Sequence, residues 1–405
     1  MNFDAVALWT ILKKNLYCPE TELFYDYRTS ADPAERFALL PTAEEIGVDF
    51  PNPCGWGTGM EDCSLNGGLA LELCRIYEPD CGFASRLVSG LERCAYIHGR
   101  TGFAARGVSV RAPLCCYSNT SRDQLTLAVY GVWRVIHSMA PEPRLRKRCA
   151  ALLAAYAVWC ERVIVPENDF SFRRLDGRPA LVSKMWECDA HEMLRLPMVY
   201  AAAFEATGDE HWRELACTLL EPGLEATLRG DGMELWWDLP TLQMQLSIRM
   251  LREWSALPER FASGLDRASR RNAAFALARF HETLAEAVKF GGVWEGFPEN
   301  WRRRPMLVQR ESLASGGTSA LFGGKAYLNP TFDDRYAVPN TLLRRLGCWL
   351  ATAVAGGKSI PEEEAGRLRQ LLSRIDFDRC GGDGPLRLLF GWGWLERFSA
   401  GCVCG

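Results

Sequence analysis

The chain has 405 residues, of which 48% are hydrophobic, and its 47 lysine and arginine residues nearly balance 50 aspartate and glutamate residues, for a net charge of −3. This balance, without a basic stripe, excludes a typical nucleic-acid-binding protein. No apolar stretch reaches the roughly 20 residues that a membrane-spanning helix needs, so we expect no membrane insertion.

The amino-terminal segment 1–16 has the pattern of an amphipathic helix and not of a signal peptide, because Lys13 and Lys14 follow its apolar residues instead of preceding them. We therefore expect a cytoplasmic protein, or a periplasmic or secreted one if a signal peptide has been removed. Several of the 16 cysteines fall inside helical patterns, and no pair has CxxC spacing. Free thiols in a reducing compartment are therefore expected.

Apolar residues at helical spacing recur along the chain and predict about twelve helices. In chain order these span 3–16, 59–77, 82–98, 121–138, 142–164, 190–206, 209–220, 240–254, 259–288, 340–355, 361–374 and 385–398. Residues 166–188 interrupt them with the pattern of a β-hairpin, whose turn is Asp176-Gly177.

Three of the predicted helices begin with a capping-box pattern, in which two side chains three residues apart each accept a backbone N–H. The boxes are Thr58–Glu61, Ser121–Gln124 and Asp189–Glu192, at nearly equal intervals. Such spacing is typical of repeated helical hairpins, and the first and last helices complete a sixth pair. The pattern therefore predicts one all-α domain over 1–405, an (α/α)₆ toroid with the hairpin and long loops at one mouth. An open α-solenoid has the same local pattern.

The connection over 289–339 is long and rich in glycine, proline and aromatic residues. Connections of this length are usually functional or disordered, and this one is too aromatic for disorder. We expect it to form a lid over the mouth. Tryptophan side chains at this and other predicted loops or helix ends can stack on the C–H faces of sugars, namely those of Trp56, Trp236, Trp237, Trp294, Trp301, Trp392 and Trp394.

Carboxylates gather at the predicted helix starts. Asp62 and Asp123 lie in the first turn of two successive helices, and Asp189 and Glu192 flank the third start. At a shared mouth, two carboxylates can hydrolyse a glycosidic bond, one as proton donor and the other as base. We expect Asp123 to be ionised, because a helix N-terminus stabilises negative charge, and Asp62 to donate the proton from a less polar setting. The helix dipole alone also favours acidic residues at these positions.

His191 stands among the carboxylates of the third start and can carry a proton. Together with Tyr117, Asn119 and Arg122 it also suits a uronate lyase, in which Asn or Arg neutralises the sugar carboxylate and Tyr117 or His191 moves the proton. The chain contains no HExxH motif, no nucleotide-binding loop and no EF-hand loop, so we expect no metal and no cofactor.

The segment 55–62, Gly-Trp-Gly-Thr-Gly-Met-Glu-Asp, and the aspartates on two successive helices resemble the six-hairpin (α/α)₆ glycosidase superfamily, with its unsaturated glucuronyl and rhamnogalacturonyl hydrolases. The resemblance implies that Asp62 and Asp123 are catalytic. The His-rich segment and the Trp-Ala-Arg-Gly signature that we associate with those hydrolases are missing here.

The expected function is a glycoside hydrolase acting on oligosaccharides, including uronate-containing ones, with Asp123, Asp62 and His191 as catalytic residues. The expected substrate-binding residues are Trp56, Tyr117, Asn119, Arg122, Asp189, Glu192, Trp237, Trp294 and Trp301. The alternatives are the lyase and a non-catalytic helical-repeat binding protein, in which the carboxylates only cap helices.

Overall fold

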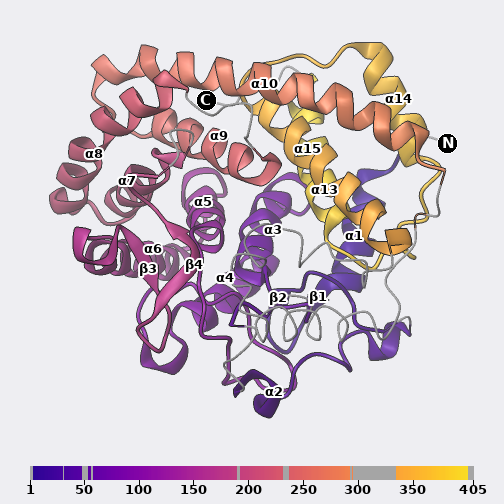
Figure 1. Ribbon diagram of the computed structural model, residues 1–405, viewed down its shortest axis with the longest axis horizontal. Coiled ribbons are helices and arrows are strands. Elements are labelled where there is room, and N and C mark those ends of the chain that lie inside the picture. Colours follow the sequence, from indigo (N-terminus) through magenta and orange to yellow (C-terminus); the bar gives the residue numbers. More distant parts are fainter. Residues whose placement is uncertain are drawn as a thin grey trace, which may run out of the picture.

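The computed structural model describes residues 3–30, 32–47, 53–55, 58–188, 192–230, 237–291, 294 and 334–399. As predicted, these residues are mainly helical, with two small antiparallel hairpins (Figure 1). No helix among them is long and apolar enough to cross a membrane. All cysteines of the described residues carry free thiols, as expected.

Except for the short α2, which was not predicted, the helices overlap the predicted ranges. In chain order they are α1 (Ala5–Leu16), α2 (Ala43–Gly47), α3 (Cys63–Tyr77), α4 (Cys81–Ala95), α5 (Arg122–Ser138), α6 (Pro143–Val163), α7 (Arg195–Thr207), α8 (Glu210–Arg229), α9 (Asp238–Glu253), α10 (Ala262–Lys289), α13 (Asp334–Ala355), α14 (Glu362–Leu372) and α15 (Gly384–Ser399). The strands are β1 (Tyr17–Cys18), β2 (Leu23–Phe24), β3 (Ser171–Arg173) and β4 (Pro179–Lys184).

The predicted capping boxes are only partly present. The Ser121 hydroxyl accepts the backbone N–H of Gln124 at 3.4 Å and caps α5 as predicted. The box at Thr58 is wrong, because the Thr58 hydroxyl donates to the Gly55 carbonyl at 2.5 Å and α3 begins only at Cys63. Helix α7 also begins later than predicted, and α8 continues beyond residue 220 through Pro222.

Six of the described helices form a continuous series of contacts. Helix α3 packs against α5, α5 against α7, α7 against α9, α9 against α13, α13 against α15, and α15 against α3. Helix α3 is buried on all sides from Cys63 to Cys74, so it belongs to the interior of the molecule. We call these six the inner helices.

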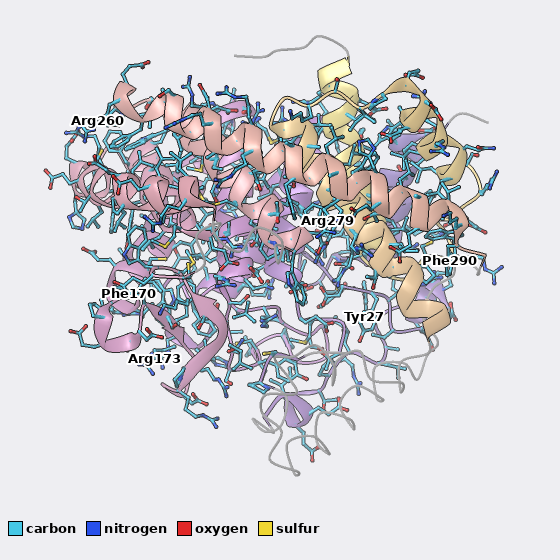
Figure 2. The ribbon with its side chains drawn as sticks, turned by 45° about the horizontal axis from the view of Figure 1, so that its top comes forward. Tyr27, Phe170, Arg173, Arg260, Arg279 and Phe290 are labelled. Atoms are coloured by element: carbon cyan, nitrogen blue, oxygen red, sulfur yellow. The ribbon has the colours of Figure 1, made fainter. Side chains whose placement is uncertain are left out.

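The remaining long helices pack outside the inner ones. Helices α4, α6, α8 and α10 contact α3, α5, α7 and α9 respectively, and α14 contacts α10. Helix α10 extends across one side of the molecule from near Arg260, past Arg279, to Phe290 (Figure 2). As predicted, the first and last helices meet: α1 contacts α15, and the ring of Phe3 lies 4.9 Å from that of Trp392.

Glycines allow the closest approaches between inner helices. A Cβ at Gly68 of α3 would lie 2.0 Å from the Leu127 carbonyl oxygen of α5, and one at Gly131 would lie 2.4 Å from the Gly68 carbonyl oxygen. Both distances are shorter than any van der Waals contact, so only glycine fits at either position. Helices α13 and α15 also approach each other closely through glycines, at Gly347 and Gly391.

The β3–β4 hairpin is present where it was predicted. Its strands pair antiparallel, and Gly177 in the turn has a φ of 84°, which favours glycine. The hairpin packs on α5 and α6. It therefore lies beside the start of α5, where the candidate site begins.

Candidate active site

The amino-terminal ends of the inner helices meet through polar side chains. Gln124 of α5 contacts Asp62 at the start of α3, and Arg195 of α7 contacts Asp123 of α5. Gln243 of α9 donates to the Asp123 carbonyl at 3.3 Å. The starts near 58 and 121, which were expected to share one mouth, therefore lie at the same end of the molecule.

Asp62 occupies the N-cap position of α3, but its side chain makes no capping bond. Oδ1 accepts a hydrogen bond from Gln124 at 2.8 Å and lies 3.5 Å from Arg106, while Oδ2 lies 3.3 Å from Arg387 and 3.6 Å from Arg344. Three guanidinium groups therefore surround this carboxylate. This is not the less polar setting that was predicted for a proton donor.

Asp26 lies behind Asp62 and was missed by the sequence reasoning. Its carboxylate accepts the backbone N–H groups of Glu61 and Asp62 at 2.6 and 3.1 Å, and the amide of Asn66 at 3.1 Å. Burial raises the pKa of Asp26 well above its ordinary value, and the negative charges of Glu61 and Asp62 raise it further. In the sequence, Asp26 is marked only as a single carboxylate that follows the apolar residues 23–25.

Asp383, which immediately precedes α15, was also missed. It is fully buried, and Arg344 binds its two oxygens at 2.6 and 2.7 Å. Burial acts to raise the pKa of Asp383, but the charges of Arg344 and Arg387 outweigh it and hold the pKa below its usual value.

Oxygens of Asp26, Asp62 and Asp383 lie within 4.8 Å of one another, a spacing that could hold a metal ion. Three arginines, however, already place positive charge against these oxygens. A divalent cation would have to displace them, so the arrangement favours guanidinium pairing over metal binding.

Asp123 lies in the first turn of α5, where the helix dipole stabilises its charge. Its Oδ1 lies 3.2 Å from Nη1 of Arg195, a fully buried side chain whose other terminal nitrogen lies 3.4 Å from Glu192. Glu192 also pairs with Arg122 at 2.5 Å. The side chains of Asp62 and Asp123 are each 18% exposed, so both carboxylates reach solvent while buried groups hold them in place.

Three predicted ligand contacts are corrected by the structure. Asn119 is fully buried, and its amide is used inside the protein: Oδ1 accepts the Leu181 N–H at 2.8 Å and Nδ2 donates to the Thr120 carbonyl at 2.7 Å. It fixes the β3–β4 hairpin and leaves nothing for a sugar. Trp392 and Trp394 are buried within α15 and belong to the core.

The other predicted residues divide into three groups. Tyr117 and Glu192 are buried, and the ring of Tyr117 covers Gly55. Trp294 is partly buried and packs edge-on against Phe290, whereas Trp237 at the start of α9 is 69% exposed. Outside the described residues lie Trp56, Asp189, His191, Trp236, Trp301 and nearly all of the expected lid over 289–339.

Comparisons of the chain with protein-family models, with curated proteins and with solved structures find no match. A function is therefore proposed from the geometry of the site.

Proposed function

We propose that the inner and outer helices form an (α/α)₆ toroid, and that the protein is a glycoside hydrolase acting on uronate-containing oligosaccharides. The return of the contact series from α15 to α3 supports the ring. The observation that carries the function is the pair of partly exposed carboxylates, Asp62 and Asp123, at one end of adjacent inner helices.

Glycoside hydrolysis needs one carboxylate that activates water or stabilises positive charge, and one acid that protonates the leaving oxygen. Asp123 suits the first role, because Arg195 and the positive end of the helix dipole lie beside its carboxylate. For the second role we assign Asp26 and Asp62 together. Their oxygens lie within 4.8 Å of each other, and two carboxyl groups in one site can share a proton. Burial raises the pKa of Asp26, which favours the proton on Asp26, and Asp62 is the member that reaches solvent.

The charge around the two carboxylates supports an acidic sugar. Arg122, which pairs with Glu192, and Arg344, which binds Asp383 and lies 3.6 Å from Asp62, are both partly exposed, and a guanidinium binds a carboxylate through two parallel hydrogen bonds. Trp237 presents an exposed ring at the start of α9, where a sugar face can stack.

The test is a panel of uronate-containing oligosaccharides, some with an unsaturated terminal uronate, incubated with the wild-type protein and with Asp123→Asn. Release of reducing ends is expected with the wild type and is expected to fall by about 100-fold or more in the variant. Hydrolysis of an unsaturated uronate removes the ultraviolet absorbance of its conjugated double bond, whereas a lyase creates that absorbance. Rising absorbance would show that the protein is a lyase and not a hydrolase. Binding of an oligosaccharide without turnover would identify a binding protein.

A further inference from the structure

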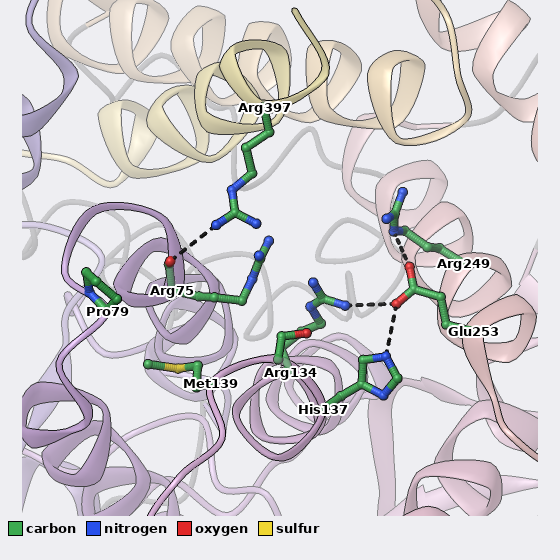
Figure 3. Close-up of a pocket in the computed structure, with 9 residues that line it drawn as sticks. Arg75, Pro79, Arg134, His137, Met139, Arg249, Glu253 and Arg397 are labelled. Carbon is green, nitrogen blue, oxygen red and sulfur yellow. Dashed lines mark hydrogen bonds and ion pairs between the residues drawn. The ribbon is translucent and has the colours of Figure 1, made fainter. Parts of the chain in front are cut away.

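A second polar site lies at the opposite ends of the inner helices. A cavity of about 390 Å³ opens near the last turns of α3, α5, α9 and α15. Four arginines line it, one from each of these helices: Arg75, Arg134, Arg249 and Arg397. Figure 3 shows Arg397 extending from α15 while Arg75 and Arg134 extend from α3 and α5 into the same space.

The carboxylates that contact these arginines are fewer than the arginines. Glu72, fully buried beneath the cavity, pairs with Arg75 and with Arg134 at 3.2 Å. Glu253 pairs with Arg134 at 2.9 Å and with Arg249 at 2.7 Å. Within the described part of the chain, these four guanidinium groups therefore share two carboxylates, which leaves an excess of two positive charges among these groups.

Arg397 is the clearest case. In the part of the chain that the structure describes, its guanidinium donates to the Arg75 carbonyl at 3.3 Å and pairs with no carboxylate. The carbonyl ends of helices attract cations, which accounts for arginines near the last turns. It does not account for four of them converging on a cavity, because exposed arginines at helix ends would ordinarily extend into water.

We propose that this cavity binds a small phosphate monoester. A doubly charged phosphoryl group matches the two unbalanced positive charges, and guanidinium groups bind phosphate oxygens through paired hydrogen bonds. The cavity volume lies within the usual range for small-molecule sites, roughly 300–1,000 Å³. The partly exposed Arg249 and Arg397 contact the phosphate, and the more buried Arg75 and Arg134, held by Glu72, supply charge from below.

The phosphate site is distinct from the candidate active site. Asp62 precedes α3 and Arg75 follows 13 residues later, in the last turn of the same helix, which corresponds to about 20 Å along the helix. Ligand binding in the cavity therefore does not depend on Asp123, and the two proposals can fail separately.

The test is calorimetric titration of the full chain, in buffer free of phosphate and sulfate, with inorganic phosphate and with a hexose 6-phosphate. One molecule is expected to bind per chain. In Arg397→Gln the affinity is expected to fall by about tenfold or more, the usual effect of losing a charged hydrogen bond. Arg397→Lys keeps the charge but not the planar fork and should bind with intermediate affinity. Arg367→Gln, which removes an exposed arginine of α14, is the matched control and should bind as the wild type does.

Equal phosphate affinity in Arg397→Gln and the wild type would overturn the proposal, as would the absence of binding at millimolar phosphate. Titration with succinate distinguishes the ligand chemistry. Tighter binding of succinate than of either phosphate compound would replace the phosphate monoester with a dicarboxylate. Tighter binding of the sugar phosphate than of inorganic phosphate would show that the cavity also recognises the sugar.

Discussion

Gln124 of α5 fixes the position of the Asp62 carboxylate at the start of α3. Its Nε2 donates to Asp62 Oδ1 at 2.8 Å and to the Glu61 carbonyl at 3.1 Å, while its Oε1 accepts the Leu65 N–H at 3.0 Å. Asp123 precedes Gln124 in the chain, so one short stretch of α5 carries one candidate carboxylate and positions the other. The spacing of the pair therefore depends on a buried amide.

Gln124→Glu tests this arrangement. The substitution keeps the size of the side chain but places a carboxylate oxygen where an N–H now faces Asp62 and the Glu61 carbonyl. The buried Glu61 carbonyl and the partly exposed Asp62 carboxylate then lose their donor, and the free energy of unfolding in urea at neutral pH is expected to fall by about 2 kcal/mol or more. Gln370→Glu, an exposed site on α14, should change it by less than about 0.5 kcal/mol. Equal effects of the two substitutions would contradict the role of Gln124.

Asp123→Asn separates a catalytic role from a structural one. The amide retains the shape of the side chain and one acceptor oxygen for Arg195, and Glu192 still pairs with that arginine. The unfolding free energy is therefore expected to change by no more than about 1 kcal/mol. Turnover of an authentic substrate should fall by about 100-fold or more, because the charged base is lost. Turnover and melting temperature are measured together, and a melting loss that accounts for the lost activity would mark Asp123 as a structural residue.

Glu72 should make part of the stability depend on pH. Burial acts to raise the pKa of Glu72, but the charges of Arg134 and Arg75 outweigh it, so its pKa in the folded protein lies below the ordinary value. The charged form therefore stabilises the protein fully above the unfolded-state pKa of about 4.3. This contribution declines as the pH falls through the folded-state pKa.

Glu72→Gln is thus expected to destabilise the protein by about 3–5 kcal/mol at neutral pH, because two arginines lose a buried partner. Urea denaturation at a series of pH values should show this difference narrowing below about pH 4.3. Glu363→Gln on the exposed face of α14 serves as the control. A difference that stays constant from neutral to acid pH would show that Glu72 does not stabilise the fold through its charge.

Trp237→Ala tests the proposed stacking face. Because the side chain is 69% exposed, its loss should change the unfolding free energy by less than about 0.5 kcal/mol. KM for the oligosaccharide is expected to rise about two- to tenfold with kcat nearly unchanged, the usual contribution of an aromatic contact. Val6→Ala, at an exposed apolar site on α1, should leave KM as it is. An unchanged KM in Trp237→Ala would remove this ring from the substrate site.

Much of the fold could be predicted from local patterns. The helices, the β3–β4 hairpin and the contact between the first and last helices all agree with expectation. Helix starts were less accurate, because a Thr-x-x-Glu pattern caps a helix only when the residues that follow the threonine are helical. After Thr58 the helix begins only at Cys63, and the Thr58 hydroxyl donates to the Gly55 carbonyl.

The candidate site was only partly predictable. Asp62 and Asp123 stood out because they lie beside predicted helix starts, whereas Asp26 and Asp383 have no comparable local signal. Asn119 was misassigned because a polar residue in a predicted loop resembles a ligand contact, and only the packing of the hairpin shows that its amide is already used.

The sequence by itself determined which segments are helical, because helix period and turn chemistry act between residues close in the chain. Only the tertiary structure decided which charges meet. Asp62 pairs with Arg344 and Arg387 from the far end of the chain, and Arg75 and Arg397 share a cavity for the same reason. A periodic pattern specifies which face of a helix is buried but not its partner, and the charge of a site depends on which helix ends the packing of the whole molecule brings together.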